Sequence, residues 1–376
     1  MQERARTISA EVKRSARALL LTSAVLFIAS CISSFGANPR GEEREALMTS
    51  LNYGEETFIN PVETDNDLEW REFREIRRRE KVDRNPPVDI PVTPPPPATY
   101  NKRHDADSVR VTWIGHATTL VELDGFRVLT DPIFGERCSP VRFAGPRRLH
   151  RPGIELEDLP EVDAVIISHD HYDHLDQESA KALAAKGVPF FVPLGVGAHL
   201  RRWEIEDVTE LDWWQHAEVR NAKGEQLRLQ ATPARHFSGR GALAQDRTLW
   251  ASWALLGPRH RVWFGGDTGY FDGFKEIGEK LGPFELTIVP VGAYDKAWKE
   301  IHVDPEEAIQ AHIDVRGEVM LPIHWGTFNL GLHAWNEPIH RALESARARD
   351  VTLITPTPGQ VVDTASPPPV SGWFNE

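Results

Sequence analysis

The sequence predicts an α/β (α+β) protein in which one body of layered β-sheets follows an N-terminal extension. Short apolar runs typical of strands alternate with helical segments from about residue 106 to the end. Some runs, such as 162–167, are almost continuously apolar, as in strands buried on both faces. Histidine and aspartate residues follow directly where several of these runs end. Because 40% of the 376 residues are hydrophobic, the chain is able to build a large core.

The first 30 residues have the composition of an export signal. Five basic and two acidic side chains precede the apolar run 18-ALLLTSAVLFIAS-30. This run is too short for a membrane-spanning helix and suits the apolar part of a signal peptide. It leads into 28-IASC-31, which resembles the bacterial lipobox. We therefore expect a lipoprotein-type signal peptide over residues 1–30, cleaved before a lipidated Cys31. A plain secretory signal and an uncleaved anchor are the alternatives.

A lipidated Cys31 implies a location in the bacterial cell envelope, with the protein facing the periplasm and anchored to the membrane surface. The next residue is Ile32 and not aspartate, which favours the outer membrane. Cys138 is then the second of two cysteines and has no partner for an internal disulfide. The remaining chain is acidic, since the net charge of the whole is −13, and this disfavours a nucleic-acid partner.

Residues 31–105 form the expected N-terminal extension and Pro-rich linker. Residues 68–81 predict a short charged helix with a solvated face. Seven of the twelve residues in 86-PPVDIPVTPPPP-97 are proline, which favours an extended chain. Such a segment either holds the body away from a membrane or lies across the body. The catalytic domain is expected over residues 106–376.

The body begins with a predicted hairpin. Apolar runs within 109–132 flank Asp124-Gly125, a dipeptide typical of two-residue hairpin turns. Helices are predicted at 177–187, which Gly187 ends, and at 304–315, where Asp304, Pro305 and Glu307 form a helix start signal. Further strands are predicted at 162–167, 188–195, 226–234, 248–257, 261–266, 286–291 and 319–325.

The segment 168-SHDHYDHLD-176 predicts a metal site. His169 and His171 are two residues apart just after a strand, so their side chains point the same way in an extended chain. Asp173 and His174 follow where the chain turns and are able to reach a second ion. Imidazole and carboxylate are the ligands that zinc takes at catalytic sites. A histidine-rich solvent-exposed loop is the alternative reading.

Three later residues complete a ligand set for two ions. His236 lies before a glycine-rich loop, Asp267 lies in 264-FGGDTGY-270, and His324 lies at the end of an apolar run. Glycines around Asp267 allow the backbone to come close. Each residue alone also fits a structural role, as a turn residue or a core imidazole.

These motifs resemble the metallo-β-lactamase superfamily and, within it, the N-acylphosphatidylethanolamine-hydrolysing phospholipase D family and its bacterial relatives. The resemblance covers about residues 107 to 345. It rests on the segments 113-WIGHATTLVE-122, 129-LTDPIFGERCSP-140, 163-DAVIISHDHYDHLD-176, 263-WFGGDTGYFDGF-274, 302-HVDPEEA-308 and 322-PIHWGTF-328. The chain departs from the family pattern at Ile301, where relatives carry a polar residue, so the substrate-facing wall is expected to differ.

The resemblance implies an αββα sandwich of two mixed β-sheets packed face to face, with helices outside and two zinc ions per chain at one edge. One ion would take His169, His171 and His236, the other would take Asp173, His174 and His324, and Asp267 would bridge them. Asp131 is expected to steady the ligands. His116 is expected near the site, with a core imidazole as the alternative.

The implied reaction is phospholipase D hydrolysis of a phospholipid substrate, which releases phosphatidate and an N-acylethanolamine. A metal-bridging hydroxide would attack phosphorus. Asp173 is expected to be a catalytic residue as well as a metal ligand. His302 and Tyr172 are candidates to assist the departure of the leaving group. Two alternatives remain: a metal-dependent lactonase or other hydrolase of small esters or cyclic phosphodiesters, and a non-enzymatic metal-binding envelope lipoprotein. His174 argues against a zinc β-lactamase. The oligomeric state stays open, with a homodimer among the possibilities.

Overall fold

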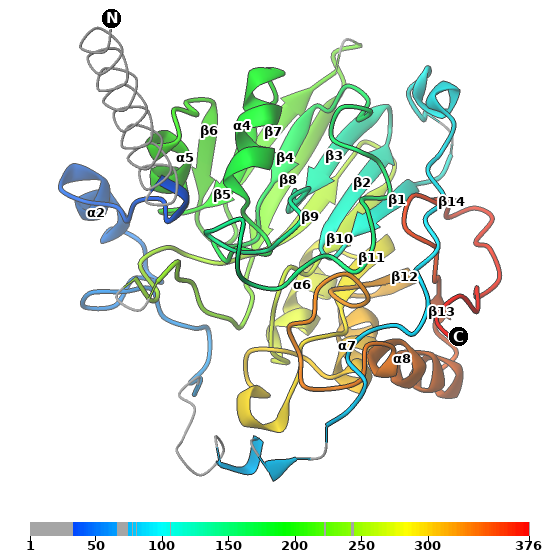
Figure 1. Cartoon of the computed structure of the whole chain (residues 1–376). Helices are drawn as coiled ribbons and strands as arrows, with labels where there is room; N and C mark the ends of the chain where they lie inside the picture. The colour runs from blue at the N-terminus through cyan, green and yellow to red at the C-terminus, as the bar shows by residue number, and fades with distance from the viewer. Residues whose placement is uncertain are drawn as a thin grey trace, which may run out of the picture.

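Two seven-stranded β-sheets pack face to face in this protein, and helices cover their outer faces (Figure 1). The computed structural model describes residues 33–65, 74–76, 78–79, 81–105, 107–221, 223–241 and 244–375. The expected signal peptide and Cys31 lie outside these residues, as does most of the expected helix at 68–81, of which 74–76 and 78 are helical. None of the described helices is long and apolar enough to cross a membrane.

The first sheet has the strand order β14-β1-β2-β3-β4-β5-β6. Its strands are β1 (Arg110–Gly115), β2 (Thr118–Leu123), β3 (Phe126–Thr130), β4 (Ala164–Ile166), β5 (Phe190–Pro193), β6 (Val208–Leu211) and β14 (Val361–Asp363). The antiparallel strands β2 and β3 form the predicted hairpin, and Asp124 and Gly125 have φ values of 50° and 78°. Two consecutive residues with positive φ are what the tightest hairpin turn requires, so the sequence prediction is confirmed.

The second sheet has the order β13-β12-β11-β10-β9-β8-β7. Its strands are β7 (His216–Arg220), β8 (Gln226–Thr232), β9 (Ser252–Leu256), β10 (Arg261–Phe264), β11 (Phe284–Pro290), β12 (Gly317–Ile323) and β13 (Thr352–Leu353). Both sheets are mixed, with parallel pairs such as β3–β4 and β11–β12 beside antiparallel ones. The fold class expected from the sequence is confirmed.

Side chains alternate along each strand of the first sheet between two cores. Val121, Val128 and Ile166 belong to the cluster that includes Leu229 and Trp253 of the second sheet. The intervening positions face the helices: Leu120, Leu129 and Val165 pack with Leu183 and Leu200. Because successive residues of a strand point to opposite faces, apolar residues at every position bury both sides of the sheet. The two cores hold the layers together and so fix the position of the edge at which the strands end.

Helices α4 (Gln177–Ala185) and α5 (Gly197–Arg202) pack on the first sheet, and α6 (Gly273–Leu281), α7 (Pro305–Asp314) and α8 (Glu337–Ala348) lie at the second (Figure 1). The start signal predicted for α7 is present, because Asp304 accepts from Glu307 N and the Glu307 side chain accepts from Asp304 N. Further short helical segments among the described residues are α2 (Glu42–Leu47), η1 (Pro97–Tyr100) and η2 (Lys296–Trp298).

The described part of the N-terminal extension lies against the body. Trp203 Nε1 donates to Ser33 O at 2.7 Å, and Arg240 Nη2 donates to Ser34 O at 2.7 Å. Further along, Thr93 N donates to Pro358 O, and the Tyr100 hydroxyl is 2.7 Å from Thr112 Oγ1. Of the two arrangements that the proline-rich composition left open, the structure has the one in which this segment crosses the body.

Candidate metal centre

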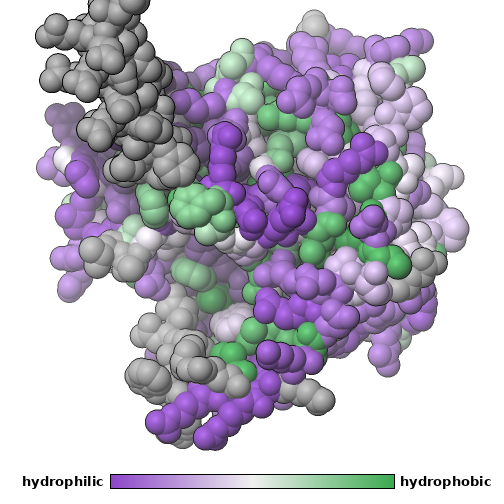
Figure 2. Space-filling view, in the orientation of Figure 1, coloured by the Kyte–Doolittle hydropathy of each residue, from purple (hydrophilic) through white to green (hydrophobic). Residues whose placement is uncertain are grey.

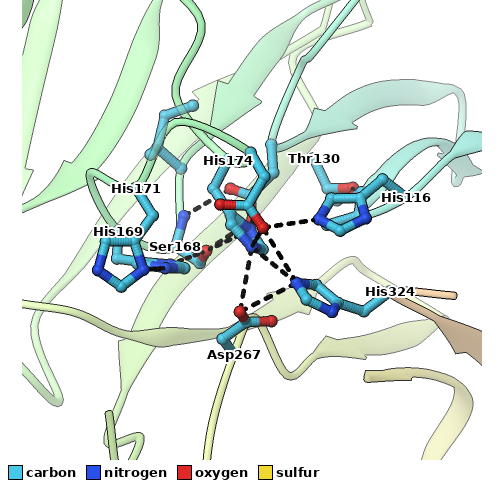
Figure 3. Close-up of polar contacts among 12 residues, drawn as sticks. His116, Thr130, Ser168, His169, His171, His174, Asp267 and His324 are labelled. Carbon is cyan, nitrogen blue, oxygen red and sulfur yellow. Dashed lines mark hydrogen bonds and ion pairs between the residues drawn. The ribbon is translucent and has the colours of Figure 1, made fainter. Parts of the chain in front are cut away.

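The candidate site lies where six strands end at the same edge of the sandwich. In the first sheet β1, β3 and β4 run in one direction, and in the second sheet β8, β10 and β12 do so. The loops that follow these strands carry every expected ligand and both expected supporting residues: His116, Asp131, His169, His171, Asp173, His174, His236, Asp267 and His324. Figure 3 shows His169 and His171 on one side, His116 and His324 on the other, and Asp267 between them.

The first group of ligand atoms consists of three imidazole nitrogens. His169 Nε2 lies 2.8 Å from His171 Nδ1, which in turn lies 3.4 Å from His236 Nε2. His236 Nδ1 donates to Ile301 O at 2.8 Å, and His169 Nδ1 lies 2.9 Å from Ser168 Oγ. With their Nδ1 atoms occupied in this way, His169 and His236 turn Nε2 lone pairs toward His171 Nδ1.

The second group combines carboxylates and imidazoles. His324 Nε2 lies 3.2 Å from Asp173 Oδ2 and 3.3 Å from His174 Nε2. Asp267 Oδ2 is 3.1 Å from His324 Nε2, 3.2 Å from His174 Nε2 and 4.0 Å from His236 Nε2. This one carboxylate oxygen therefore lies between the two groups, as a bridging ligand requires.

Asp131 supports the second group from behind. Its carboxylate accepts hydrogen bonds from His174 Nδ1 at 2.7 Å, from Ser168 N at 2.6 Å and from Ser168 Oγ at 2.6 Å. The bond to Nδ1 leaves the Nε2 lone pair of His174 facing the other ligands. The expected supporting position of Asp131 agrees with these contacts.

His116 contacts the ligands directly. Its Nε2 donates to Asp173 Oδ2 at 2.9 Å, and its backbone carbonyl accepts from His324 N at 3.3 Å. His116 N donates to Thr327 Oγ1 at 2.8 Å, and Thr327 Oγ1 lies 2.9 Å from His150 Nε2. His116 thus contacts one expected ligand by its side chain and another by its backbone, which agrees with the expected position near the site.

The backbone at the site takes conformations that are rare for residues with a side chain. His116, Asp131 and His324 have φ values of 54°, 33° and 66°. Left-handed backbone of this kind is held in place only where the surrounding contacts fix it, and it is frequent at functional sites. Gly266 allows the Asp267 loop to come close, because a Cβ on it would lie 2.6 Å from Ser168 Cβ.

A cavity of about 340 Å³ opens onto the ligand atoms. Its polar lining consists of His171, Asp173, Asp267, His302 and His324. The other lining side chains are apolar: Phe237, Ala293, Ala297, Trp298, Ile301 and Leu330. On the face shown in Figure 2, hydrophobic side chains form small patches among mainly hydrophilic ones. The ligand set is therefore accessible from outside and does not form a closed structural site.

The two candidates for leaving-group assistance lie in different surroundings. His302 lines the cavity, with Nδ1 3.9 Å from Asp267 Oδ2, and burial lowers its pKa to about 4. The Tyr172 hydroxyl instead donates to Arg240 O at 2.8 Å, and the Arg240 guanidinium lies over its ring at 4.1 Å. The structure brings His302 to the ligands and directs the Tyr172 hydroxyl to another part of the chain.

The surroundings of the expected ligands shift their pKa values in directions that suit a cation site. Burial lowers the pKa values of His169 and His236 far below the usual range, so both rings are neutral and able to bind a metal. Burial acts in the same direction on His174, but the carboxylates of Asp267 and Asp173 outweigh it and hold its pKa well above the usual value. The two carboxylates thus attract positive charge to this point.

The described residues fit divalent metal ions. A single proton on His171 is unable to satisfy the lone pairs of both His169 and His236, whereas one cation satisfies all three nitrogens. The buried Asp267 Oδ1 atom has no hydrogen-bond partner among the described residues. Orphaned buried carboxylate oxygens are costly, and a bound ion removes the cost.

Sequence reasoning did not assign several residues that support the site. Ser168 and Thr327 lie inside the quoted motifs, so their proximity to ligands was a usable signal. Arg235 directly precedes the expected ligand His236, which is a local signal of the same kind. His150 and Asn60 lie outside the motifs, and nothing in their local sequence indicates that they reach the site.

Comparison with known proteins gives a consistent result. A model of the β-lactamase superfamily domain matches residues 126–325. An uncharacterised protein of Mycobacterium tuberculosis is 51% identical over 76% of this chain and 77% of its own length. A Caenorhabditis elegans protein named N-acyl-phosphatidylethanolamine-hydrolysing phospholipase D 1 is 39% identical over 70% of this chain and 78% of its own length.

Two further similarities concern location and fold. Outer membrane protein RomA of Klebsiella pneumoniae is 46% identical over 102 residues, which make up 27% of this chain and 76% of that protein. Among solved structures, a metallo hydrolase from Ignicoccus hospitalis has a TM-score of 0.54 at 23% identity and covers 68% of this chain and 98% of its own. At that identity the structural likeness supports the fold alone.

Proposed function

Because the chain belongs to the metallo-β-lactamase superfamily, whose fold and metal-binding residues make it a metal-dependent hydrolase, we propose that it hydrolyses a phosphodiester bond in phospholipids of the N-acylphosphatidylethanolamine type. Water attacks phosphorus, the bond from phosphorus to the ethanolamine oxygen breaks, and that oxygen takes a proton. The products are phosphatidate and an N-acylethanolamine. The similarity to the Caenorhabditis elegans enzyme supports this substrate class.

The ligand groups would hold two zinc ions. His169, His171 and His236 form one set, Asp173, His174 and His324 form the other, and Asp267 lies between them. Zinc in such a pair supplies a water of lowered pKa and neutralises charge on phosphate oxygens.

The observation that carries the proposal is the position of four expected ligands, His171, Asp173, Asp267 and His324, in the wall of a cavity whose remaining lining is apolar except for His302. Ile301 and Trp298 contribute to the apolar lining and would contact hydrocarbon beside the reacting phosphate. His302 lies at the same wall, where its ring, neutral because of the lowered pKa, would donate a hydrogen bond to the leaving oxygen. At about 340 Å³ the cavity accommodates the head group region and leaves the long acyl chains outside.

The proposed location supports a lipid substrate. Ser33, two residues after Cys31, is held beside α4 and α5 by Gln177 Nε2, which donates to Ser33 Oγ at 2.8 Å, and by Trp203. A lipid anchor on Cys31 would therefore fix the body close to the membrane surface. The similarity to an outer membrane protein supports an envelope location.

Mass spectrometry of lipid products tests the proposal. Zinc-loaded protein that begins after Cys31 is incubated with mixed micelles of phospholipids that include N-acylphosphatidylethanolamine, with His169→Ala as the control. We expect phosphatidate and N-acylethanolamine in equal amounts, and neither product from the control. A panel of lactones and small esters is assayed in parallel. Turnover of those compounds without phospholipid cleavage would transfer the assignment to a lactonase or small-ester hydrolase.

A further inference from the structure

The N-terminal extension contacts a metal ligand through one side chain, that of Asn60. Asn60 Oδ1 accepts from His236 N at 3.0 Å, and Asn60 Nδ2 donates to His236 O at 2.7 Å. The two residues are 176 positions apart in the chain. A side-chain amide has the same donor and acceptor arrangement as a peptide group, so this pair of bonds holds both sides of the His236 backbone.

A second contact ties the same extension to the neighbouring loop. Arg235, just before the ligand, donates from Nη2 to Glu63 O at 2.8 Å and from Nε to Thr64 Oγ1 at 2.9 Å. Arg235 Nη2 also pairs with Glu300 Oε2 at 2.6 Å, and that oxygen accepts from Asp65 N at 2.7 Å. Residues 60–65 therefore connect the loop that carries His236 with the loop that carries Ile301 and His302.

The ring of His236 is held by that second loop. His236 Nδ1 donates to Ile301 O at 2.8 Å. The extension therefore contacts the backbone of His236 directly and supports its imidazole indirectly, through the loop that carries Ile301. Hydrogen bonds that orient a ligand in this way change metal affinity even though they do not touch the ion.

The extension is docked independently of Asn60. The Phe58 side chain is 2% exposed and makes an edge-to-face contact with Tyr53 at 4.9 Å. Phe58 N donates to Asp246 O at 2.9 Å, and Asn52 Nδ2 donates to Asp212 Oδ1 at 2.8 Å. Loss of the Asn60 amide would therefore leave the segment in place and change the support of His236 alone.

We propose that residues 58–65 of the extension are part of the metal centre and that Asn60 is a positioning residue for His236. Asn60 fixes the backbone of this ligand, so that its Nε2 lone pair stays directed at the point shared with His169 and His171. The inference rests on the assignment of His236 as a ligand and is independent of the phospholipid substrate.

The test compares Asn60→Ala with Asn52→Ala, which removes a similar hydrogen bond between the extension and the body at Asp212. Zinc affinity is measured by competition with a chromogenic chelator, and the ligand geometry is followed by visible absorption of the cobalt-substituted proteins. We expect Asn60→Ala to weaken the binding of one ion about 10- to 100-fold and to alter the cobalt spectrum. Asn52→Ala should match the wild type in both measurements.

Asn60→Asp provides a second variant, which keeps the acceptor for His236 N but places an oxygen against His236 O. We expect it to weaken the binding of the same ion. Affinities within about 2-fold of the wild type for both Asn60 variants would overturn the inference, as would an equal loss in Asn52→Ala. Metal binding is measured apart from lipid cleavage. A wild-type protein that binds two ions but cleaves no phospholipid would contradict the proposed function and leave this comparison valid.

Discussion

Asp131 accepts a hydrogen bond from His174 Nδ1 at 2.7 Å, and neither side chain is exposed to solvent. The same carboxylate accepts two bonds from Ser168, which precedes the first ligand of the cluster. Asp131 therefore joins the loop after β3 to the loop after β4 and determines which nitrogen of His174 faces the candidate metal centre.

Substitution of Asp131 by asparagine should weaken metal binding about 10- to 100-fold. The amide keeps the shape of the side chain but replaces one of its two acceptor oxygens, of which Oδ1 accepts from Ser168 N and Oδ2 accepts from Ser168 Oγ and His174 Nδ1. The metal content after dialysis against a weak chelator, measured by elemental mass spectrometry, checks this outcome. Asp272→Asn is a matched control, because the Asp272 side chain is 86% exposed. Equal metal retention by both variants would contradict the role of Asp131.

Removal of metal should destabilise the folded protein. Buried carboxylates and imidazoles are left facing one another, and a ligand at 100 times its dissociation constant stabilises a folded protein by about 2.7 kcal/mol. Thermal unfolding after treatment with a strong chelator should occur at a lower temperature, and zinc should restore the original value when two ions are bound per chain. Magnesium at the same concentration should not, because it disfavours imidazole ligands. Restoration at one ion per chain would contradict the two-ion assignment.

His302 and Tyr172 should differ in their effect on turnover. His302→Gln is expected to lower kcat about 100- to 1000-fold without loss of metal, because its ring lies in the cavity wall near the reacting atoms. Tyr172→Phe is the matched comparison and should stay within about 3-fold of the wild type, since the hydroxyl bonds to Arg240 O and not to a ligand. Steady-state kinetics with a chromogenic phosphodiester checks both. A larger loss of kcat in Tyr172→Phe than in His302→Gln would reverse the assignment.

Asp246 should make stability depend on pH. Burial raises its pKa from 3.8 to about 6, so its contribution to stability is complete below the unfolded pKa and is lost as the pH rises through the folded pKa. Asp246→Asn keeps the acceptor for Ser238 N and has no charge to bury. Its stability relative to the wild type should therefore increase by about 1 kcal/mol between pH 5 and pH 8, as measured by urea unfolding. A pH-independent difference would contradict the raised pKa.

The central strands and the ligands were predictable because their signals are local. Residues 164–167, which lie just before the cluster, are all apolar, and β4 forms there. Each expected ligand follows the end of an apolar run, which the sequence shows directly, whereas the meeting of these strand ends at one edge was implied only by the family resemblance. The capping residues of α7 were likewise readable at Asp304 and Glu307.

There is a physical reason why the peripheral elements could not be predicted from the sequence. Strands β6 and β7 lie at the edges of the two sheets, and their burial is partial, so they lack a continuous apolar pattern. Strands β13 and β14 have two and three residues and exist only through pairing with β12 and β1. Helices α5, α6 and α8 were also not predicted. The predicted strand at 248–257 starts only at Ser252.

The contacts by which distant residues support the site also could not be predicted from the local sequence. Asn60 and Arg235 meet His236 and Glu300 through contacts between segments far apart in the chain. Tyr172 illustrates the opposite case, because a position inside the ligand cluster suggested a catalytic role, while its hydroxyl bonds to Arg240. The direction of a side chain depends on tertiary packing that sequence spacing does not describe.

The most direct test of the account is the position of label after hydrolysis of N-acylphosphatidylethanolamine in water enriched in a heavy oxygen isotope. Attack of water on phosphorus places the heavy oxygen in phosphatidate and leaves the N-acylethanolamine unlabelled, and mass spectrometry of both products reads this directly. We predict that result for the zinc-loaded wild type. Label in the N-acylethanolamine would contradict attack on phosphorus, and label in a released fatty acid would contradict phosphodiester hydrolysis at this metal centre.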